Sequence, residues 1–146
     1  MFWKSKMLNK SQEERLVQAI EEAEKGNCGE VRVHLERKCP EEDPLQRAEQ
    51  MFFELGMQNT KQGTAALLYI SIDSKKAAIY AGPGLYQARE QEFWLRAIEL
   101  VTEGFRQNTP IQGIEKALGN IGDLFREIVP GEDEAGNELP NQVSTS

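Results

Sequence analysis

Two apolar runs joined by a short polar turn constrain the fold of this chain more than any other feature. The first run extends from Thr64 to Ile72 and the second from Ala77 to Ala81, with the turn Asp73 to Lys76 between them. Apolar runs of this length, bounded by turn residues, are typical of buried β-strands. Because a turn this short permits only an antiparallel return, the stretch predicts a β-hairpin. The chain then leaves the sheet through the glycine-rich segment Gly82 to Leu85.

An alternating segment upstream predicts a third strand. In Gly29 to Glu36 the apolar residues alternate with Arg32, His34 and Glu36, the pattern of a strand with one buried and one solvated face. A helix is predicted from Asp43 to Gly56, with an N-cap followed by proline at its start. A strand, a helix and a strand in succession form a right-handed parallel crossover, so this strand should lie parallel to the first hairpin strand. Its polar face favours an edge position and makes His34 a structural or solvated residue.

Helical periodicity predicts three further helices. The first begins with the capping-box pair Ser11 and Glu14 and ends near Lys25. The others cover Phe93 to Phe105 and Thr109 to Ile128, the latter with a second capping box at its start. All the elements together predict an α/β fold, a three-layer α/β/α sandwich. Its mixed sheet contains a parallel crossover and an antiparallel hairpin, with helices on both faces.

Length and composition predict one domain with two flanking segments. A chain of 146 residues is long enough to bury one core and too short for two comfortable ones. Residues 1–10 are interpreted as an N-terminal extension and residues 11–130 as the domain. Residues 131–146 are acidic and polar with almost no apolar content, so we expect a flexible acidic tail.

Charge, hydropathy and cysteine spacing indicate a cytoplasmic protein that is not an integral membrane protein. The net charge of −7 argues against a nucleic-acid binder, which usually needs a clustered basic surface. No window approaches the ~20 apolar residues of a membrane span, and Met1 to Leu8 lack the apolar core and cleavage site of a secretory signal. Cys28 and Cys39 would be separated by roughly eleven extended residues at ~3.3 Å each, too far apart for a disulfide. Two separate thiols favour a reducing compartment.

The topology also predicts a composite site. An antiparallel return places the exit of the hairpin at the end of the sheet where both parallel strands begin. We therefore expect one end of the sheet to bring together residues far apart in the sequence, and it is a candidate ligand-binding or partner-binding site. Its candidate residues are Glu30, Thr60, Thr64, Gly82 and Gly84. No complete catalytic set accompanies them, so no catalytic residue is assigned.

Each candidate has two interpretations at this stage. Glu30 would be a metal ligand or a general base, or else a solvated residue at a strand edge. Gly82 and Gly84 would present backbone amides to an anion, or else permit a tight turn, and Pro83 removes one possible donor. Calcium generally requires six to eight oxygen ligands, whereas Glu30 is the single obvious carboxylate at this end.

One aromatic residue stands apart from the expected core. Most large aromatic side chains recur at helical spacing, which core packing explains. Phe53 lies off the apolar stripe of its helix. An exposed Phe53, together with Tyr80 or Tyr86, would indicate a partner surface.

Several short segments follow one another in a specific order, namely Gly29 to Val33, Ala48 to Phe52, Gly63 to Leu68 and Asn137 to Pro140. In order and spacing they resemble the TPM domain family over most of the chain. The resemblance implies a small α/β/α domain. The family includes the thylakoid-lumen protein linked to photosystem II repair and many bacterial proteins without an assigned reaction.

The resemblance implies two candidate functions. Some members are reported as acid phosphatases and some bind calcium. One branch has the loop Gly-Asp-x-Gly-Ile after the hairpin, whereas Ala81 to Leu85 contains no acidic residue here, and Tyr86 stands where a second branch tends to have Glu. The first candidate is therefore a binding or accessory module for a protein partner, membrane-associated or involved in envelope stress. The alternative is a weak acid phosphatase that uses calcium or magnesium held by Glu30.

Overall fold

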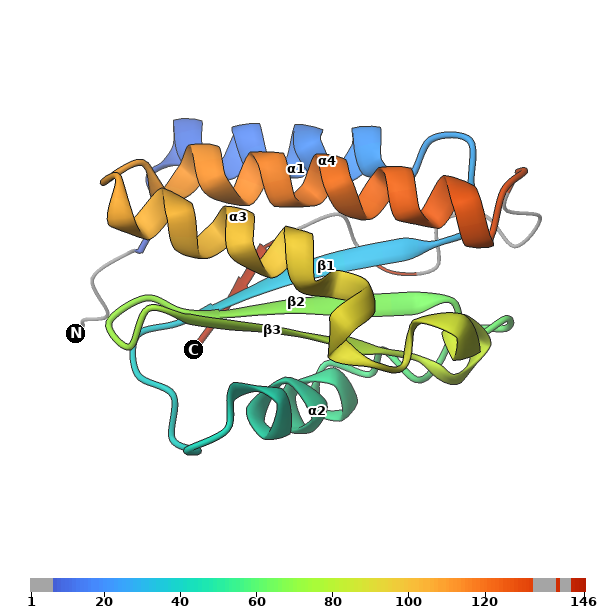
Figure 1. Ribbon diagram of the computed structural model, residues 1–146, viewed down its shortest axis with the longest axis horizontal. Coiled ribbons are helices and arrows are strands. Elements are labelled where there is room, and N and C mark those ends of the chain that lie inside the picture. Colours follow the sequence, from blue (N-terminus) through green and yellow to red (C-terminus); the bar gives the residue numbers. More distant parts are fainter. Residues whose placement is uncertain (1–6, 133–138, 140–142) are drawn as a thin grey trace.

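A four-stranded mixed sheet forms the middle layer of the protein (Figure 1). The computed structural model describes residues 7–132, 139 and 143–146. Helices α1, α3 and α4 cover one face of the sheet and α2 covers the other (Figure 1), which confirms the three-layer fold. The elements in chain order are α1 (Lys10–Ala23), β1 (Glu30–Glu36), α2 (Pro44–Glu54), β2 (Ala65–Ser71), β3 (Lys76–Ala81), the 3-10 helices η1 (Pro83–Ala88) and η2 (Gln91–Trp94), α3 (Leu95–Arg106), α4 (Pro110–Ile128) and β4 (Val143–Thr145).

The sheet has the strand order β3-β2-β1-β4. β1 runs parallel to β2, with Glu30 opposite Ala65, and β2 runs antiparallel to β3, with Ala66 opposite Ala81. Both strand relationships predicted from the sequence are therefore confirmed. The parallel pair follows from the α2 crossover, and the antiparallel pair follows from the short hairpin turn.

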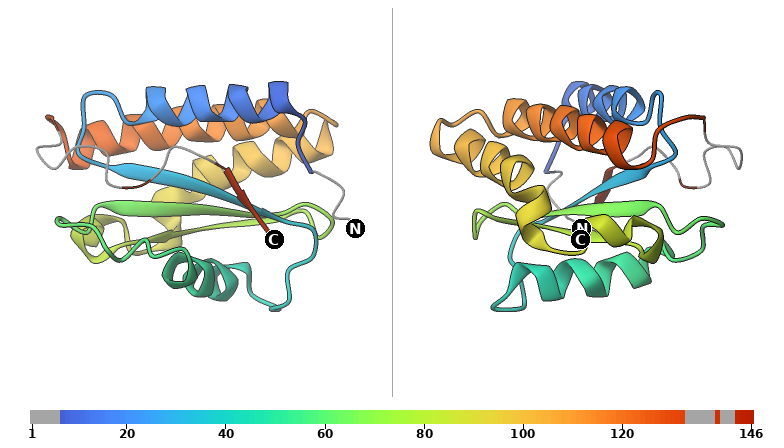
Figure 2. Two further views of the ribbon diagram at one scale, coloured as in Figure 1. Left: turned by 180° about the vertical axis from the view of Figure 1, so that it is seen from behind. Right: turned by 45° about the vertical axis from the view of Figure 1, so that its right-hand side comes forward.

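The prediction that β1 is an edge strand is wrong. β4 pairs with β1 in parallel, with Val33 opposite Val143, and Figure 2 shows this strand beside β1 near the C-terminus. All seven residues of β1 are consequently buried, including those on its polar face. The local pattern did not reveal this burial because the covering strand comes from the far end of the chain. Most of the expected acidic tail lies outside the described residues, whereas Val143–Thr145 form a strand.

Helix starts differ from the predicted capping boxes. The N-cap of α1 is Asn9, whose side chain accepts the Gln12 backbone N–H at 2.8 Å, while the Gln12 side chain accepts the Asn9 N–H at 2.9 Å. Ser11 therefore lies inside the helix. Asn caps a helix as well as Ser does, so the two positions could not be distinguished by residue type. At α4, Thr109 makes no side-chain capping bond, and Pro110 begins the helix.

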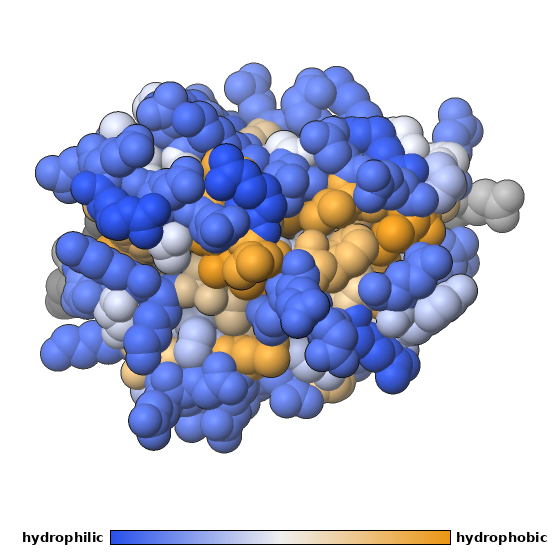
Figure 3. Space-filling view, in the orientation of Figure 1, coloured by the Kyte–Doolittle hydropathy of each residue, from blue (hydrophilic) through white to orange (hydrophobic). Residues whose placement is uncertain are grey.

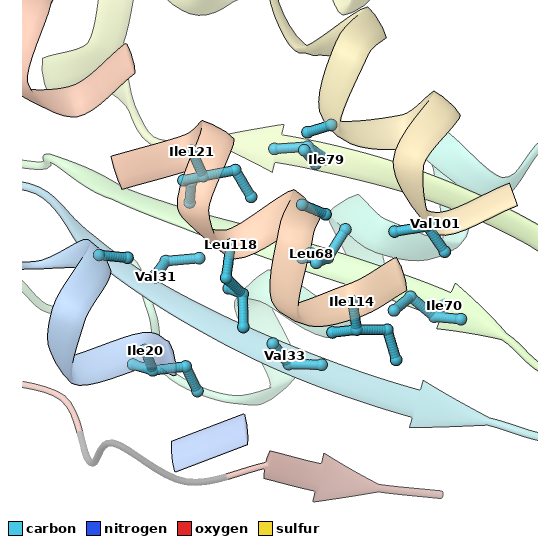
Figure 4. Packing of buried hydrophobic residues seen from close by; sticks show 14 of the residues in the cluster. Ile20, Val31, Val33, Leu68, Ile70, Ile79, Val101, Ile114, Leu118 and Ile121 are labelled. Atoms are coloured by element: carbon cyan, nitrogen blue, oxygen red, sulfur yellow. The ribbon is translucent and has the colours of Figure 1, made fainter. Parts of the chain in front are cut away.

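Two hydrophobic clusters lie on the two faces of the sheet. The larger one joins the sheet to α1, α3 and α4, where Ile20, Val33 and Leu118 are fully buried (Figure 4). The smaller one lies beneath α2 and includes Phe52 and Leu67. Full burial of such a side chain contributes roughly 1.5–3 kcal/mol each, so both clusters hold the helices on the sheet.

The N-terminal segment joins the larger cluster before the first helix. Leu8 is buried in that cluster, and Asn9 caps α1. The described part of the expected extension therefore packs on the domain. Among the helices in the described ranges, none combines the length and apolar character needed to cross a bilayer.

Candidate functional site

The start of β1, the loop before β2 and the exit from β3 meet at one end of the sheet, at the right of Figure 1. The Glu30 N–H donates to the Thr64 carbonyl at 3.0 Å, and the Gly82 N–H donates to the Ala65 carbonyl at 2.7 Å. Gly84 continues this contact, because its N–H donates to the Gly63 carbonyl at 2.8 Å. The predicted convergence is thus present. We call this region, formed by residues 28–30, 60–65 and 82–84, the converging end.

Close backbone packing explains the glycines of the converging end. A Cβ on Gly84 would lie 2.0 Å from the Gln62 carbonyl oxygen, and one on Gly82 would lie 2.7 Å from the Gly63 oxygen. Contacts under 3.0 Å cannot form without displacing backbone. The Gly82 and Gly84 amides both donate within the protein. The tight-turn interpretation therefore accounts for both residues.

Glu30 is buried rather than solvated, with 4% of its surface exposed. Its Oε1 accepts the backbone N–H of Leu139 at 2.8 Å. Thr64 is also engaged, because its hydroxyl donates to the Cys28 carbonyl at 2.7 Å. The buried Thr60 hydroxyl has no hydrogen-bond partner among the described residues. An unpaired buried hydroxyl is costly, so Thr60 is the member of this set with capacity for a further bond.

The opposite end of β1 carries a largely buried polar network that the sequence prediction missed. Its residues are His34, Glu36, Arg47, Tyr69, Ser144 and Ser146. Arg47 donates to both carboxylate oxygens of Glu36, at 3.0 and 2.8 Å, and the Tyr69 hydroxyl donates to Glu36 Oε1 at 2.6 Å. Ser146 donates to Glu36 Oε2 at 2.5 Å. Four hydrogen bonds therefore satisfy one buried carboxylate.

His34 joins this network to β4. Its Nδ1 lies 2.7 Å from Ser144 Oγ, and its Nε2 lies 2.7 Å from Ser146 Oγ. Because Ser146 donates its only hydroxyl proton to Glu36, it must accept from His34, which places the imidazole proton on Nε2. Nδ1 then accepts from Ser144. With Nε2 protonated, His34 is not positioned to deprotonate Ser146, so this pair is not an activated nucleophile.

The environment of the network shifts its ionisation. Burial lowers the pKa of His34 to about 4, against the opposing effect of Glu36. Burial alone would raise the pKa of Glu36, but hydrogen bonds from Arg47, Ser146 and Tyr69 lower it to about 2. Burial, followed by the bond to Glu36, raises the pKa of Tyr69. At neutral pH the network therefore contains a neutral imidazole, an ionised carboxylate and a protonated phenol.

Comparison with known proteins gives the family. The sequence profile described as the TPM domain matches residues 2–124. The chain belongs to the TPM domain family. The resemblance found in the sequence is thereby confirmed, and the match covers most of this TPM domain.

Solved structures agree with this assignment. This TPM domain is similar to the BA42 protein of the psychrophilic bacterium Bizionia argentinensis, with 31% identity, 100% of both chains covered and a TM-score of 0.85. An N-terminal domain from P. gingivalis shares the fold at 18% identity, with 84% and 79% coverage and a TM-score of 0.67. The N-terminal domain of cg2496 from Corynebacterium glutamicum shares it at 13% identity, with 92% and 80% coverage and a TM-score of 0.62. A search of functionally curated proteins returned no match.

The described residues of the converging end do not fit a calcium or magnesium ion. Within the described ranges, no group of three His, Cys, Asp or Glu side chains could hold a metal. Among the described residues, two carboxylates lie near this end, and both are engaged: Glu30 accepts the Leu139 amide and Glu24 accepts the Val31 amide. The burial of Glu30 also leaves little room for the water ligands that magnesium usually keeps. These residues therefore support a contact surface better than a metal centre.

The missed network had one signal in the sequence. Val143 to Ser146 combine one apolar, β-branched residue with three hydroxyl residues, a composition compatible with a short strand. Its hydroxyl groups could have been recognised as hydrogen-bond partners for the polar face of β1, which this segment helps to bury. Three residues are too few for a strand prediction on periodicity alone.

Proposed function

We propose that this TPM domain is a noncatalytic accessory module that binds a protein partner at the converging end. Exposed Tyr86 carries the proposal. It lies in η1 immediately after the glycine loop, and 69% of its surface is exposed. A large exposed aromatic residue beside a rigid backbone platform is typical of a protein contact surface. Glu30, Thr64, Gly82 and Gly84 form that platform beneath Tyr86, and the Thr60 hydroxyl is buried beside them.

The proposal also covers the kind of partner and the location of the protein in the cell. We infer a partner that is membrane-associated or involved in envelope stress, following the resemblance to the thylakoid-lumen repair protein. The net charge of −7 makes a protein partner more favourable than a nucleic acid. A cytoplasmic location is supported by the sequence separation of Cys28 and Cys39, which is too long for a disulfide across an extended strand.

The alternative, a metal-dependent acid phosphatase, has weaker support. It requires an ion that polarises a phosphoryl oxygen and activates water. The ligand set described above is too small to hold such an ion. Both amides of the glycine loop donate within the protein, so they also offer little to a phosphate.

A photo-crosslinking pull-down tests the contact surface. The bait should carry Tyr86→Ala, with Ser74→Ala as the matched control at the opposite end of the sheet, where Ser74 is exposed. Substitutions of Gly82 and Gly84 are unsuitable because their Cβ atoms would displace backbone. We expect Tyr86→Ala to lose the crosslinked partner and Ser74→Ala to keep it. Equal capture by both variants would contradict the proposed surface.

Enzyme assays separate the two functions. We expect no turnover of p-nitrophenyl phosphate at acid or neutral pH with millimolar calcium or magnesium. We also expect no saturable NMR shift of the Glu30 or Gly84 amides upon addition of either ion. Hydrolysis that Glu30→Gln abolishes would establish the phosphatase instead.

A further inference from the structure

The outer edge of β3 presents backbone groups that no strand covers. β3 is the last strand on its side of the sheet. The hydrogen bond from the Gly82 N–H to the Ala65 carbonyl shows which residues of β3 direct their backbone groups toward β2. In an antiparallel ladder, every second residue directs its N–H and C=O away from the neighbouring strand. These residues are Ala77, Ile79 and Ala81.

A side-chain amide occupies the middle of this edge. The Ile79 N–H donates to Gln91 Oε1 at 3.3 Å, and Gln91 Nε2 donates to the Ile79 carbonyl at 2.6 Å. The Gln91 carboxamide thus makes the same pair of bonds as a peptide group of an adjacent antiparallel strand. None of the hydrogen bonds between described residues reaches the outward groups of Ala77 or Ala81. The edge is therefore adapted to an extended backbone, although Ile79 and Ala77 are buried, with 1% and 9% of their surface exposed.

A groove of about 390 Å³ follows the same edge. Leu45 of α2 and Tyr80 of β3 give it an apolar wall, and Pro83 also lines it. Phe53 packs against Tyr80 with ring centroids 6.1 Å apart, and 47% of Phe53 is exposed. Figure 3 shows the molecule from the side of β3, where groups of apolar side chains lie between polar ones, the larger groups over α3 and α4. If a segment of another protein paired with the edge of β3 as a further strand, its alternate side chains would lie against this wall.

The charge of the groove indicates which kind of segment could pair with this edge. Arg89 is the only charged residue that lines the groove among the described residues, in a chain with a net charge of −7. Arg89 is exposed, and it forms no ion pair with any described residue. A carboxylate on the occupant would complement it. Because Glu49 also acts on Tyr80 of the same wall, the favoured segment carries its carboxylate opposite Arg89.

We propose that β3 binds an extended peptide segment of a partner protein, with a carboxylate opposite Arg89, as an added antiparallel strand, which displaces the Gln91 carboxamide. Main-chain bonds to Ala77, Ile79 and Ala81 hold the segment, as in other strand-addition complexes. Gln91 satisfies the central groups of the edge when the segment is absent. This site adjoins the converging end, with which it shares Pro83, but Tyr86 does not line the groove.

A defined peptide tests the proposal on the full chain. The probe is the acetylated and amidated peptide Thr-Val-Thr-Val-Glu-Val-Thr, followed by NMR of the backbone amides. We expect saturable shifts at Ala77, Ile79 and Ala81 at millimolar peptide. The same peptide with N-methyl groups on alternate residues keeps its side chains but cannot form the ladder. It should leave these amides unchanged.

Two variants test the roles of the side chains. Gln91→Ala removes the internal competitor and should tighten binding about tenfold. Its matched control is Gln87→Ala, an exposed glutamine of η1 outside the groove, which should bind like the wild type. Arg89→Glu should weaken binding of the glutamate peptide severalfold and strengthen binding of the peptide with lysine at that position.

Three outcomes would overturn the proposal. The first is equal binding of the N-methylated peptide. The second is the absence of shifts at these amides with 10 mM peptide in both the wild type and a folded Gln91→Ala variant. The third is dimerisation of Gln91→Ala in sedimentation experiments without peptide binding, which would assign the edge to a second copy. If Gln91→Ala fails to fold, the two peptides with the wild type decide the question, and the Tyr86→Ala pull-down still tests the other surface separately.

Discussion

The two ends of β1 are built in different ways, although both bring together segments far apart in the sequence. The converging end is held mainly by backbone bonds and by glycines that allow backbones to touch. The other end is held by side chains, with an ionised Glu36 between Arg47, Tyr69 and Ser146. The groups with strongly shifted pKa values, His34, Glu36 and Tyr69, lie at the end where side chains hold the fold together. The exposed Tyr86 lies at the end proposed to bind a partner. Shifted pKa values in this protein therefore indicate a structural network.

The largest expected change in stability is at the converging end. Gly84→Ala should lower the free energy of unfolding by about 4 kcal/mol, because its Cβ would meet the Gln62 carbonyl. Urea denaturation measures the change. Gly119→Ala is the control, since Gly119 is exposed on α4 and no atom lies within 4 Å of its Cβ. It should gain roughly 0.5–1 kcal/mol of helix propensity. Equal stability of the two variants would show that the loop contact is not tight.

A smaller loss of stability is expected at the other end of β1, around Glu36 and Arg47, which we call the charged end. Glu36→Gln should cost about 3 kcal/mol, because it leaves the largely buried Arg47 without its charge partner. The double variant Glu36→Gln, Arg47→Met should recover part of this loss, since neither charge remains. A double-mutant cycle from urea denaturation measures the coupling. Additive losses would mean that the pair does not stabilise the fold as a unit.

Acid should weaken the charged end through His34. Its pKa is about 4 in the folded state, below the ordinary histidine value of 6.5, so the unfolded chain binds the proton first. The stability associated with neutral His34 is complete above pH 6.5 and is lost as the pH falls to 4, by about 3 kcal/mol. Glu36 adds a further loss between pH 4.5 and 2. Denaturation across this pH range should show a flatter slope above pH 4.5 in His34→Gln, and an unchanged slope would contradict the assignment.

The smallest effect concerns the attachment of β4. Ser144→Ala removes one hydrogen bond to His34 and should cost about 1 kcal/mol. The backbone N–H of Ser146 bonds to Leu35 at 3.0 Å and reports the opening of the strand by hydrogen exchange. We expect faster exchange in Ser144→Ala than in Thr145→Ala, whose side chain is exposed. Equal exchange would show that backbone pairing alone holds β4.

The sequence predicted the strands of the converging end because their signals are local. A short turn requires an antiparallel return, and a helical crossover requires a parallel neighbour. These two rules were enough to bring Glu30 and Gly84 to the same end of the sheet. They could not show that Glu30 is buried, because its cover includes Leu139 from the far end of the chain.

The charged end was misjudged for a related reason. Alternation in β1 correctly indicated two unlike faces, but a polar face can be solvated or satisfied by buried partners. Those partners, Arg47 and the serines of β4 and the C-terminus, lie elsewhere in the chain. The same limit applies to α1, where Asn9 and Ser11 were equally suitable caps by residue type.

By itself the sequence determined the order of the elements, their directions in the hairpin and crossover, and membership in the TPM family. These properties depend on spacing along the chain, which periodicity and turn chemistry record directly. The tertiary structure alone decided that β1 is interior, that His34 is neutral and buried, and that Gln91 covers the edge of β3. Each depends on contacts between segments separated along the chain, and burial and ionisation are set by those contacts.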